Sequence, residues 1–158
     1  MMVVVQGTKE FNDYNVFLRA MGVALSNLPS NDQFFYVYTL GGKKVNEFVF
    51  EFCNLSERNM RARKKKIKYY TVTNSWVEEN MNDVNYFIYL SKPGENISKM
   101  AELAKNSGVE LGLFQYWEEN MLIKNIEEAE KIVNQSKDLR WVGWNIVSWK
   151  KDSNGFSN

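Results

Sequence analysis

Apolar residues along the first 116 positions follow two alternating periods. Some short runs are apolar at nearly every position, which is typical of strands that are buried on both faces of a sheet. Such runs lie at 2–5, 33–40 and 84–90, and two further strands are expected at 67–73 and 109–116. Between these strands, apolar residues recur at helical spacing at 17–28, 45–55 and 97–104. Residues 75–79 suit a short helix. The alternation predicts an α/β, Rossmann-like three-layer fold with a mostly parallel five-stranded sheet and helices on both faces.

Capping residues mark the expected helix ends. Asn12 or Asp13 precedes the first helix, and either side chain can accept a hydrogen bond from the first turn. Ser75 is followed three residues later by Glu78, which is the pattern of a capping box. Gly108 follows the third long helix, where glycine commonly ends a helix.

The pattern changes after residue 116. Apolar residues at 126, 129, 132 and 133 predict a helix, and three tryptophans, Trp141, Trp144 and Trp149, lie in a strand or extended arm. Two interpretations of the tryptophans are open. They cover one edge or face of the sheet, or they form a contact with a second copy or a stacking wall for a base. We expect a core at 1–116, an extension at 117–149 packed on it, and a flexible tail at 150–158.

The chain contains no histidine, and Cys53 is its single cysteine. Intrachain disulfides, Cys/His zinc sites and histidine-based triads are therefore excluded. Cys53 lies in the apolar run 50–53, so a buried thiol is expected. Any catalysis would depend on carboxylate, Lys, Tyr or Ser side chains, or on a metal held by a ligand. We expect neither a cofactor nor a metal.

The formal net charge is only +1, but the window from Arg58 to Lys68 contains seven basic residues and no acidic residue. One interpretation is a solvated helix end, whose cations suit the helix dipole. The other is a patch for nucleic acid or an acidic partner. The run lacks the interleaved aromatic residues of a single-strand platform, which favours the first. No apolar run reaches the roughly 20 residues of a membrane span, and no signal peptide is recognisable, so we expect a cytoplasmic protein.

Three loops that follow predicted strands carry the candidate chemistry. In an open parallel sheet such loops share one edge, where glycine lets the backbone approach a phosphate and helix N-termini favour anions. The candidate ligand-binding residues are Gly7, Thr8, Lys9, Phe11, Asn12 and Tyr14, then Gly41, Gly42 and Asn46, and then Ser91, Lys92, Gly94, Glu95 and Ser98.

Each residue type suggests a role in a ligand-binding crevice formed by these three loops. The glycine N–H groups and the Thr8 and Ser98 hydroxyls would donate to phosphates, and Lys9 and Lys92 would supply positive charge. Asn46 would bind a ribose or a phosphate. Phe11 or Tyr14 would stack on a base, or would pin the loop to the core instead.

These loops resemble those of the SLOG superfamily, the Rossmann-like nucleotide-binding group that includes lysine-decarboxylase-like phosphoribohydrolases and small YspA-like proteins. Residues 7–14 look like the opening glycine loop, 41–46 like the second, and 91–98 like a degraded Pro-Gly-Gly-x-Gly-Thr loop. The resemblance implies a nucleotide pocket. It also places Ala101 where the hydrolases have a catalytic Glu, and Glu102 lies about 100° further round a helix. The hydrolase activity is therefore not expected.

The composition, rich in aromatic residues, Asn and Lys, is similar to that of proteins from large bacteriophages of low-GC bacteria. The resulting hypothesis is a non-catalytic protein that binds a nucleotide-derived signal, such as an ADP-ribose-type or cyclic nucleotide, and sequesters it from host defence. Two alternatives are open. One is a host-takeover protein that binds and inhibits a host protein through its surface. The other is a nucleotide-processing enzyme that uses Glu10, Asp13 or Glu95. Homo-oligomers are common among the relatives and are expected here.

Overall fold

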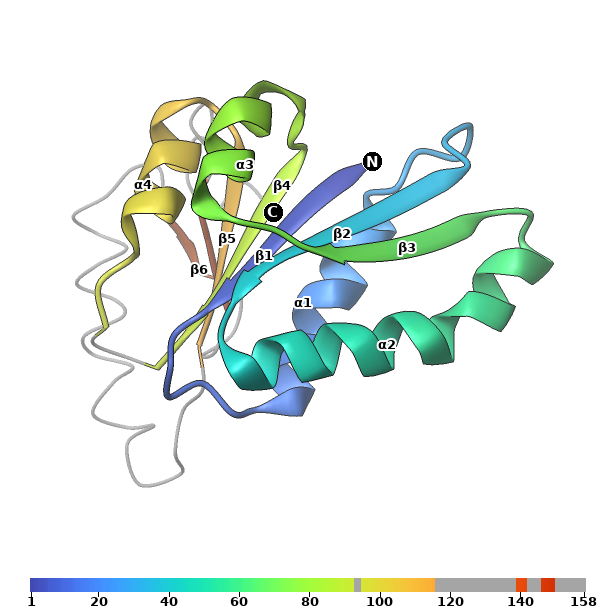
Figure 1. Cartoon of the computed structure of the whole chain (residues 1–158), viewed down its shortest axis with the longest axis horizontal. Helices are drawn as coiled ribbons and strands as arrows, with labels where there is room; N and C mark the ends of the chain where they lie inside the picture. Colours follow the sequence, from blue (N-terminus) through green and yellow to red (C-terminus); the bar gives the residue numbers. More distant parts are fainter. Residues whose placement is uncertain (93–94, 116–138, 142–145, 150–158) are drawn as a thin grey trace.

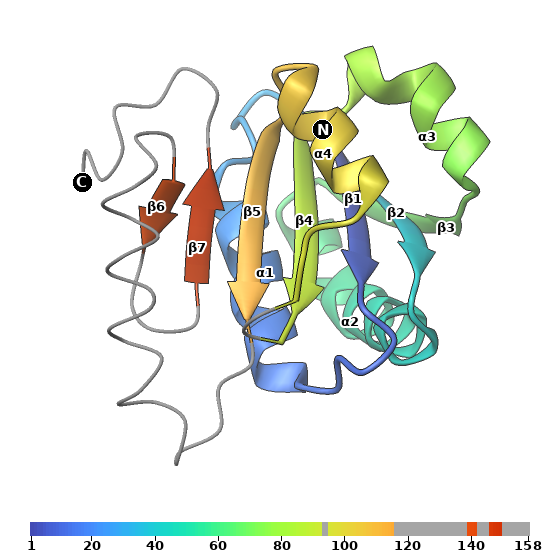
Figure 2. The same ribbon diagram turned by 90° about the vertical axis from the view of Figure 1, so that its left-hand side faces the viewer.

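The protein folds around one twisted sheet (Figures 1 and 2). The computed structural model describes residues 1–92, 95–115, 139–141 and 146–149. Five strands are parallel: β1 (Met2–Gly7), β2 (Phe34–Gly41), β3 (Lys66–Thr71), β4 (Tyr86–Ser91) and β5 (Glu110–Gln115). Their order in space is β3-β2-β1-β4-β5. The predicted α/β, Rossmann-like fold is confirmed.

Two further strands extend the sheet beyond β5. β7 (Ile146–Trp149) pairs antiparallel with β5, and β6 (Leu139–Trp141) pairs antiparallel with β7. The Trp-rich segment was predicted as a single strand or arm, and its backbone forms two strands at the sheet edge instead. The predicted helix around residues 126–133, Trp144 and the tail at 150–158 lie outside the described residues.

Helices cover the two faces of the parallel strands (Figure 2). One face carries α1 (Tyr14–Ser26) and α2 (Lys43–Ala62), and the other carries α3 (Asn74–Asn80), the 3-10 turn η1 (Met81–Asp83) and α4 (Lys99–Asn106). β1 shows how the core divides. Val3 and Val5 belong to the cluster beneath α1 and α2, whereas Val4 belongs to the cluster beneath α3 and α4. The central strand is buried on both faces, as its continuous apolar run predicts.

Two of the predicted caps are confirmed and one is wrong. The Asp13 side chain accepts a hydrogen bond from the Val16 N–H (3.0 Å), and Gly108 has φ +83° directly after α4. Thr73, rather than Ser75, caps α3, because the extended backbone of Thr73 lets its hydroxyl accept from the Trp76 N–H at 3.2 Å. The capping-box pattern therefore misplaced the start of this helix.

Leu55 is the last residue of the apolar helical spacing predicted at 45–55, but its side chain is 70% exposed. Val45, Val49 and Phe52 are buried on the inner side of α2. At 100° per residue, Leu55 lies about 80° from Val45, on the flank away from Val49, so the helix turns it towards solvent. The spacing of ten residues between Val45 and Leu55 therefore did not place Leu55 on the buried side of α2.

Cys53 is buried in α2 as predicted, at 3% exposure. Burial disfavours the thiolate and raises the pKa of the Cys53 thiol to about 12. We therefore expect iodoacetamide at pH 8 to alkylate the native protein at least about 100-fold more slowly than the urea-unfolded chain. Mass spectrometry of timed samples measures both rates. Equal rates would show that the thiol is accessible and ionises normally.

Candidate functional site

The structure brings the three predicted loops together at the carboxyl ends of β1, β2 and β4. The Thr8 N–H donates to the Leu90 carbonyl oxygen at 2.9 Å, which links the first loop to the end of β4. The second loop is equally close, because a Cβ added to Gly42 would lie 3.2 Å from the Gly7 carbonyl oxygen. The described residues of the predicted loops, 7–14, 41–46, 91–92 and 95–98, therefore lie in one region of the fold, which we call the loop edge.

The Glu95 carboxylate lies between the first and third loops. Its Oε1 accepts a hydrogen bond from the Thr8 hydroxyl (3.0 Å) and another from the Lys92 backbone N–H (2.6 Å). The Thr8 hydroxyl was predicted to donate to a phosphate, and Lys92 was predicted to supply positive charge. In this structure the Thr8 hydroxyl donates to an internal carboxylate instead, and Glu95 joins the two loops by accepting from Thr8 and from the Lys92 backbone through a single anionic oxygen.

Ser98 connects the same region to α4. Its hydroxyl donates to the Gln6 carboxamide oxygen (2.5 Å) and accepts from the Ala101 N–H (3.0 Å), so it caps the helix while it holds the end of β1. The sequence prediction treated Ser98 as a phosphate donor and overlooked Gln6. The available signal was that Gln6 is a polar residue directly after the buried run Val3–Val5.

The second loop depends on glycine conformations. Gly41 has φ +143° and Gly42 has φ +90°, both in the region that disfavours side chains, and Gly42 precedes α2. Asn46 lies one turn into this helix, where its carboxamide oxygen accepts a hydrogen bond from the buried Thr39 hydroxyl. The oxygen predicted to serve a ligand thus holds α2 to β2. Thr39, inside an apolar run, gave no signal of this role.

The two aromatic residues of the first loop pack against the protein. Phe11 is 1% exposed and belongs to the core beneath α1 and α2, so its predicted stacking on a base is wrong. Tyr14 is half-buried against Phe17 and Phe48, with ring centroids at 5.8 and 5.1 Å. Burial, followed by the Glu51 carboxylate, raises the pKa of Tyr14. The alternative interpretation, that these rings pin the loop, describes the contacts.

The other predicted residues differ in exposure. Lys9 and Asn12 are exposed on the first loop, and Lys92 is half-buried. Ser91 is 2% exposed, so its side chain is enclosed at the end of β4. Gly94 lies outside the described residues. The lysines are accessible to a ligand, whereas the Ser91 side chain is not.

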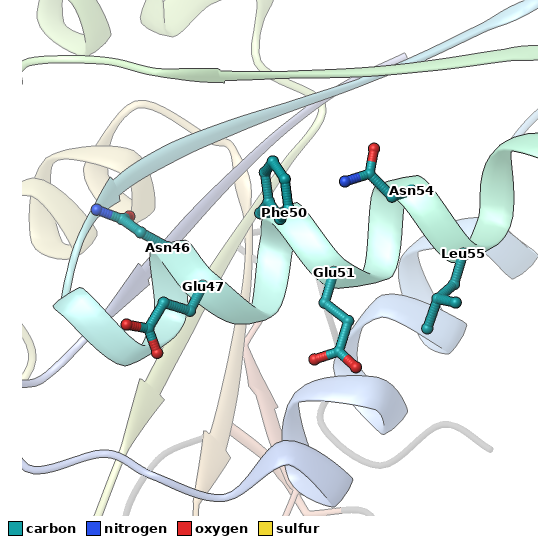
Figure 3. Close-up of a pocket in the computed structure, with 6 residues that line it drawn as sticks. All are labelled: Asn46, Glu47, Phe50, Glu51, Asn54 and Leu55. Atoms are coloured by element: carbon teal, nitrogen blue, oxygen red, sulfur yellow. The ribbon is translucent and has the colours of Figure 1, made fainter.

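A shallow groove of about 630 Å³ lies along the outer side of α2 (Figure 3). Its lining residues are Asn46, Glu47, Phe50, Glu51, Asn54 and Leu55. All of them come from one helix, so no opposing wall would bury a small ligand. Among the described residues of the loop edge, the groove includes Asn46 alone. We therefore place the candidate site at the loop edge and not in this groove.

The described residues of the loop edge offer a hydroxyl group, backbone N–H groups and two accessible lysine side chains as hydrogen-bond donors. Within the described ranges, no group of three or more His, Cys, Asp or Glu could hold a metal ion. Of the carboxylates considered for catalysis, Asp13 caps α1, Glu10 is exposed, and Glu95 is bound to Thr8 and Lys92. Ala101, at the position of the hydrolase glutamate, is completely buried.

Comparisons with protein-family models, with curated proteins and with solved structures find no match to this chain. The resemblance to the SLOG superfamily therefore stays a prediction, and the functional inference depends on geometry. No helix in the described part of the chain is long and apolar enough to cross a membrane.

Proposed function

We propose that the protein binds a nucleotide or a nucleotide-derived small molecule at the loop edge without transforming it. The observation that carries the proposal is the position of the Glu95 carboxylate. Donors from two loops, the Thr8 hydroxyl and the Lys92 N–H, converge on its Oε1. Convergent hydroxyl and backbone donors are also what a phosphate oxygen requires.

In this proposal a ligand phosphate takes the place of the Glu95 carboxylate. Phosphate offers three acceptor oxygens and carries more negative charge than a carboxylate at neutral pH. Exposed Lys9 and half-buried Lys92, from the first and third loops, supply positive charge. The Thr8 and Lys92 donors are satisfied both before and after the exchange, so opening the site leaves no buried donor unpaired. The Glu95 carboxylate then competes with the ligand phosphate for these donors, and this competition lowers the affinity for the ligand.

Binding without chemistry is supported by the residues around the third loop. The position of the hydrolase glutamate holds the buried Ala101, and Glu102 is exposed one residue later in α4. In the bacteriophage setting that the sequence resembles, a protein that holds a nucleotide-derived signal and does not consume it would sequester the signal from host defence.

Glu95→Gln tests the proposal. The variant removes the competing charge and keeps a carboxamide oxygen that can accept from Thr8 and Lys92. Because a neutral acceptor holds these donors less strongly than a charged one, we expect about tenfold tighter binding of an anionic ligand. Isothermal titration calorimetry with ADP-ribose, cyclic ADP-ribose isomers and cyclic dinucleotides measures the change.

Glu10→Gln is the matched control, because it removes the same charge from an exposed position in the first loop. The affinity of this variant for the anionic ligand is expected to stay within about twofold of that of the unsubstituted protein, since an exposed charge is screened by salt. Two results would contradict the proposal. One is an equal gain in both variants, and the other is no binding of any of these ligands at millimolar concentration.

A further inference from the structure

A row of aromatic side chains lies on β2, away from the loop edge. Phe34, Tyr36 and Tyr38 alternate along the strand and therefore share one face of the sheet. The rings of Phe34 and Tyr36 are stacked at 5.6 Å with an interplanar angle of 3°, and Tyr36 and Tyr38 follow at 6.3 Å. Neither the fold nor the proposed nucleotide site requires aromatic residues at these three alternate positions.

Strand β3 adds basic residues to the same face. Its parallel pairing with β2 sets Phe34 beside Lys66, Tyr36 beside Lys68, and Tyr38 beside Tyr70. Tyr38 and Tyr70 are stacked at 5.6 Å, and both lysines are exposed. Aromatic and basic side chains thus lie next to one another across two strands. We call the six residues Phe34, Tyr36, Tyr38, Lys66, Lys68 and Tyr70 the β2–β3 face.

The β2–β3 face is open to solvent at both ends of its aromatic row. Phe34 is 37% exposed and Tyr70 is 44% exposed. α2 lies below β2 and β3 in Figure 1, and no described helix lies above the amino-terminal halves of these strands. On that side, α3 and α4 pack over β1, β4 and β5. At the carboxyl end of the row, Tyr38 packs against the cluster beneath these helices, and Trp76 of α3 stacks on the Tyr38 ring at 4.4 Å.

Further cations continue from this face into the turn between α2 and β3. Arg63 and Lys64 are exposed there. Two other members of the basic run are occupied, because Lys65 donates to the carbonyl oxygens of Ser30 and Asp32 while Arg61 pairs with Glu57. The linear sequence lacked interleaved aromatic residues, but the pairing of β3 with β2 supplies them from a strand that precedes α2.

We propose that the β2–β3 face binds single-stranded nucleic acid. Unpaired bases stack on the exposed rings of Phe34 and Tyr70, and phosphates bind Lys66, Lys68 and the cations of the turn. A protein partner fits the face less well, because lysine is depleted at the cores of protein interfaces, whereas aromatic rings beside cations suit a strand with bases and phosphates. The inference is independent of the nucleotide site, which lies at the carboxyl ends of β1, β2 and β4.

Fluorescence anisotropy of the full chain with labelled 15-nucleotide oligo-dT and oligo-U tests this proposal. We expect salt-dependent binding that Tyr70→Ala and Phe34→Ala each weaken at least about fivefold, since each ring stacks one base. The double variant Lys66→Ala/Lys68→Ala should lower the slope of log affinity against log salt by about 1.4, which is about 0.7 for each lost phosphate contact.

Matched controls come from the opposite face and from α4. Phe50 is 56% exposed on α2, and Lys99 is exposed on α4. Phe50→Ala and Lys99→Ala should bind as the original chain does, and circular dichroism should show that every variant is folded. Several results would overturn the proposal: no binding at 50 mM salt and about 100 μM protein, equal binding of a 15-base-pair duplex, or binding that the aromatic variants leave unchanged. Failure of ADP-ribose binding would leave these readouts unaffected.

Discussion

Replacing Phe11 with alanine is expected to lower the free energy of unfolding by about 3–5 kcal/mol. The ring is 1% exposed and packs in the cluster beneath α1 and α2, so its removal leaves a cavity in addition to the lost burial. Urea unfolding followed by circular dichroism measures the change. Leu55→Ala is the control, because a side chain that is 70% exposed should alter stability by no more than about 0.5 kcal/mol.

The Phe11 result also distinguishes two roles for the first loop. If the ring pinned the loop, stability would fall sharply, as the packing indicates. If it served as a stacking surface for a base, Phe11→Ala would keep the original stability and lose ligand affinity alone. That second outcome would contradict the core position assigned to this residue.

Gly7→Ala is expected to destabilise the protein by about 1–3 kcal/mol. A Cβ at this position would lie 2.3 Å from Cγ2 of Val45, whose side chain is completely buried and has no room to move away. Gly7 therefore permits the close approach of the end of β1 to the start of α2. Thermal and urea unfolding measure the loss.

Gly22→Ala is the matched substitution with the opposite expected sign. Gly22 lies inside α1, and a Cβ there would meet nothing within 4 Å. Alanine should stabilise the helix by up to about 1 kcal/mol, because it restricts the unfolded chain and has higher helix propensity. Similar changes in stability for Gly7→Ala and Gly22→Ala would show that the contact with Val45 does not determine the effect of the substitution at Gly7.

The fold was largely accessible from the sequence because burial on both faces leaves a periodic signal. The apolar runs at Val3–Val5 and 84–90 predicted central strands, and the structure buries Val3–Val5 and residues 86–90. The end of the chain was harder to predict. β6 and β7 extend the sheet as an antiparallel pair, and strand pairing at an edge depends on backbone contacts that a local pattern does not encode.

The candidate site was only partly predictable. Parallel topology was enough to place the three loops at one edge, because all the strands end there. The contacts within the edge were not predictable, since they join residues far apart in the chain: Thr8 and Glu95 are separated by 87 positions, and Gln6 and Ser98 by 92. A list of donor residues could not reveal that a loop carboxylate already uses two of them.

The β2–β3 face illustrates the same difficulty. Along the chain, the basic run has no interleaved aromatic residues, which favoured its interpretation as a solvated helix end. Strand pairing sets Lys68 beside Tyr36 and Tyr70 beside Tyr38, so the interleaving exists across strands and not along one. Chemistry that depends on neighbouring strands is visible only when their register is known.

The proposed function depends on an anion-binding site formed by the donors that Glu95 holds. Its most direct test is an amide NMR titration of the original chain and Glu95→Gln with ADP-ribose. We expect the largest shifts at Thr8, Lys92 and residue 95, with saturation of Glu95→Gln at about one tenth of the ligand concentration. Shifts confined to the groove along α2 or to the β2–β3 face, or none in Glu95→Gln at millimolar ligand, would contradict the claim.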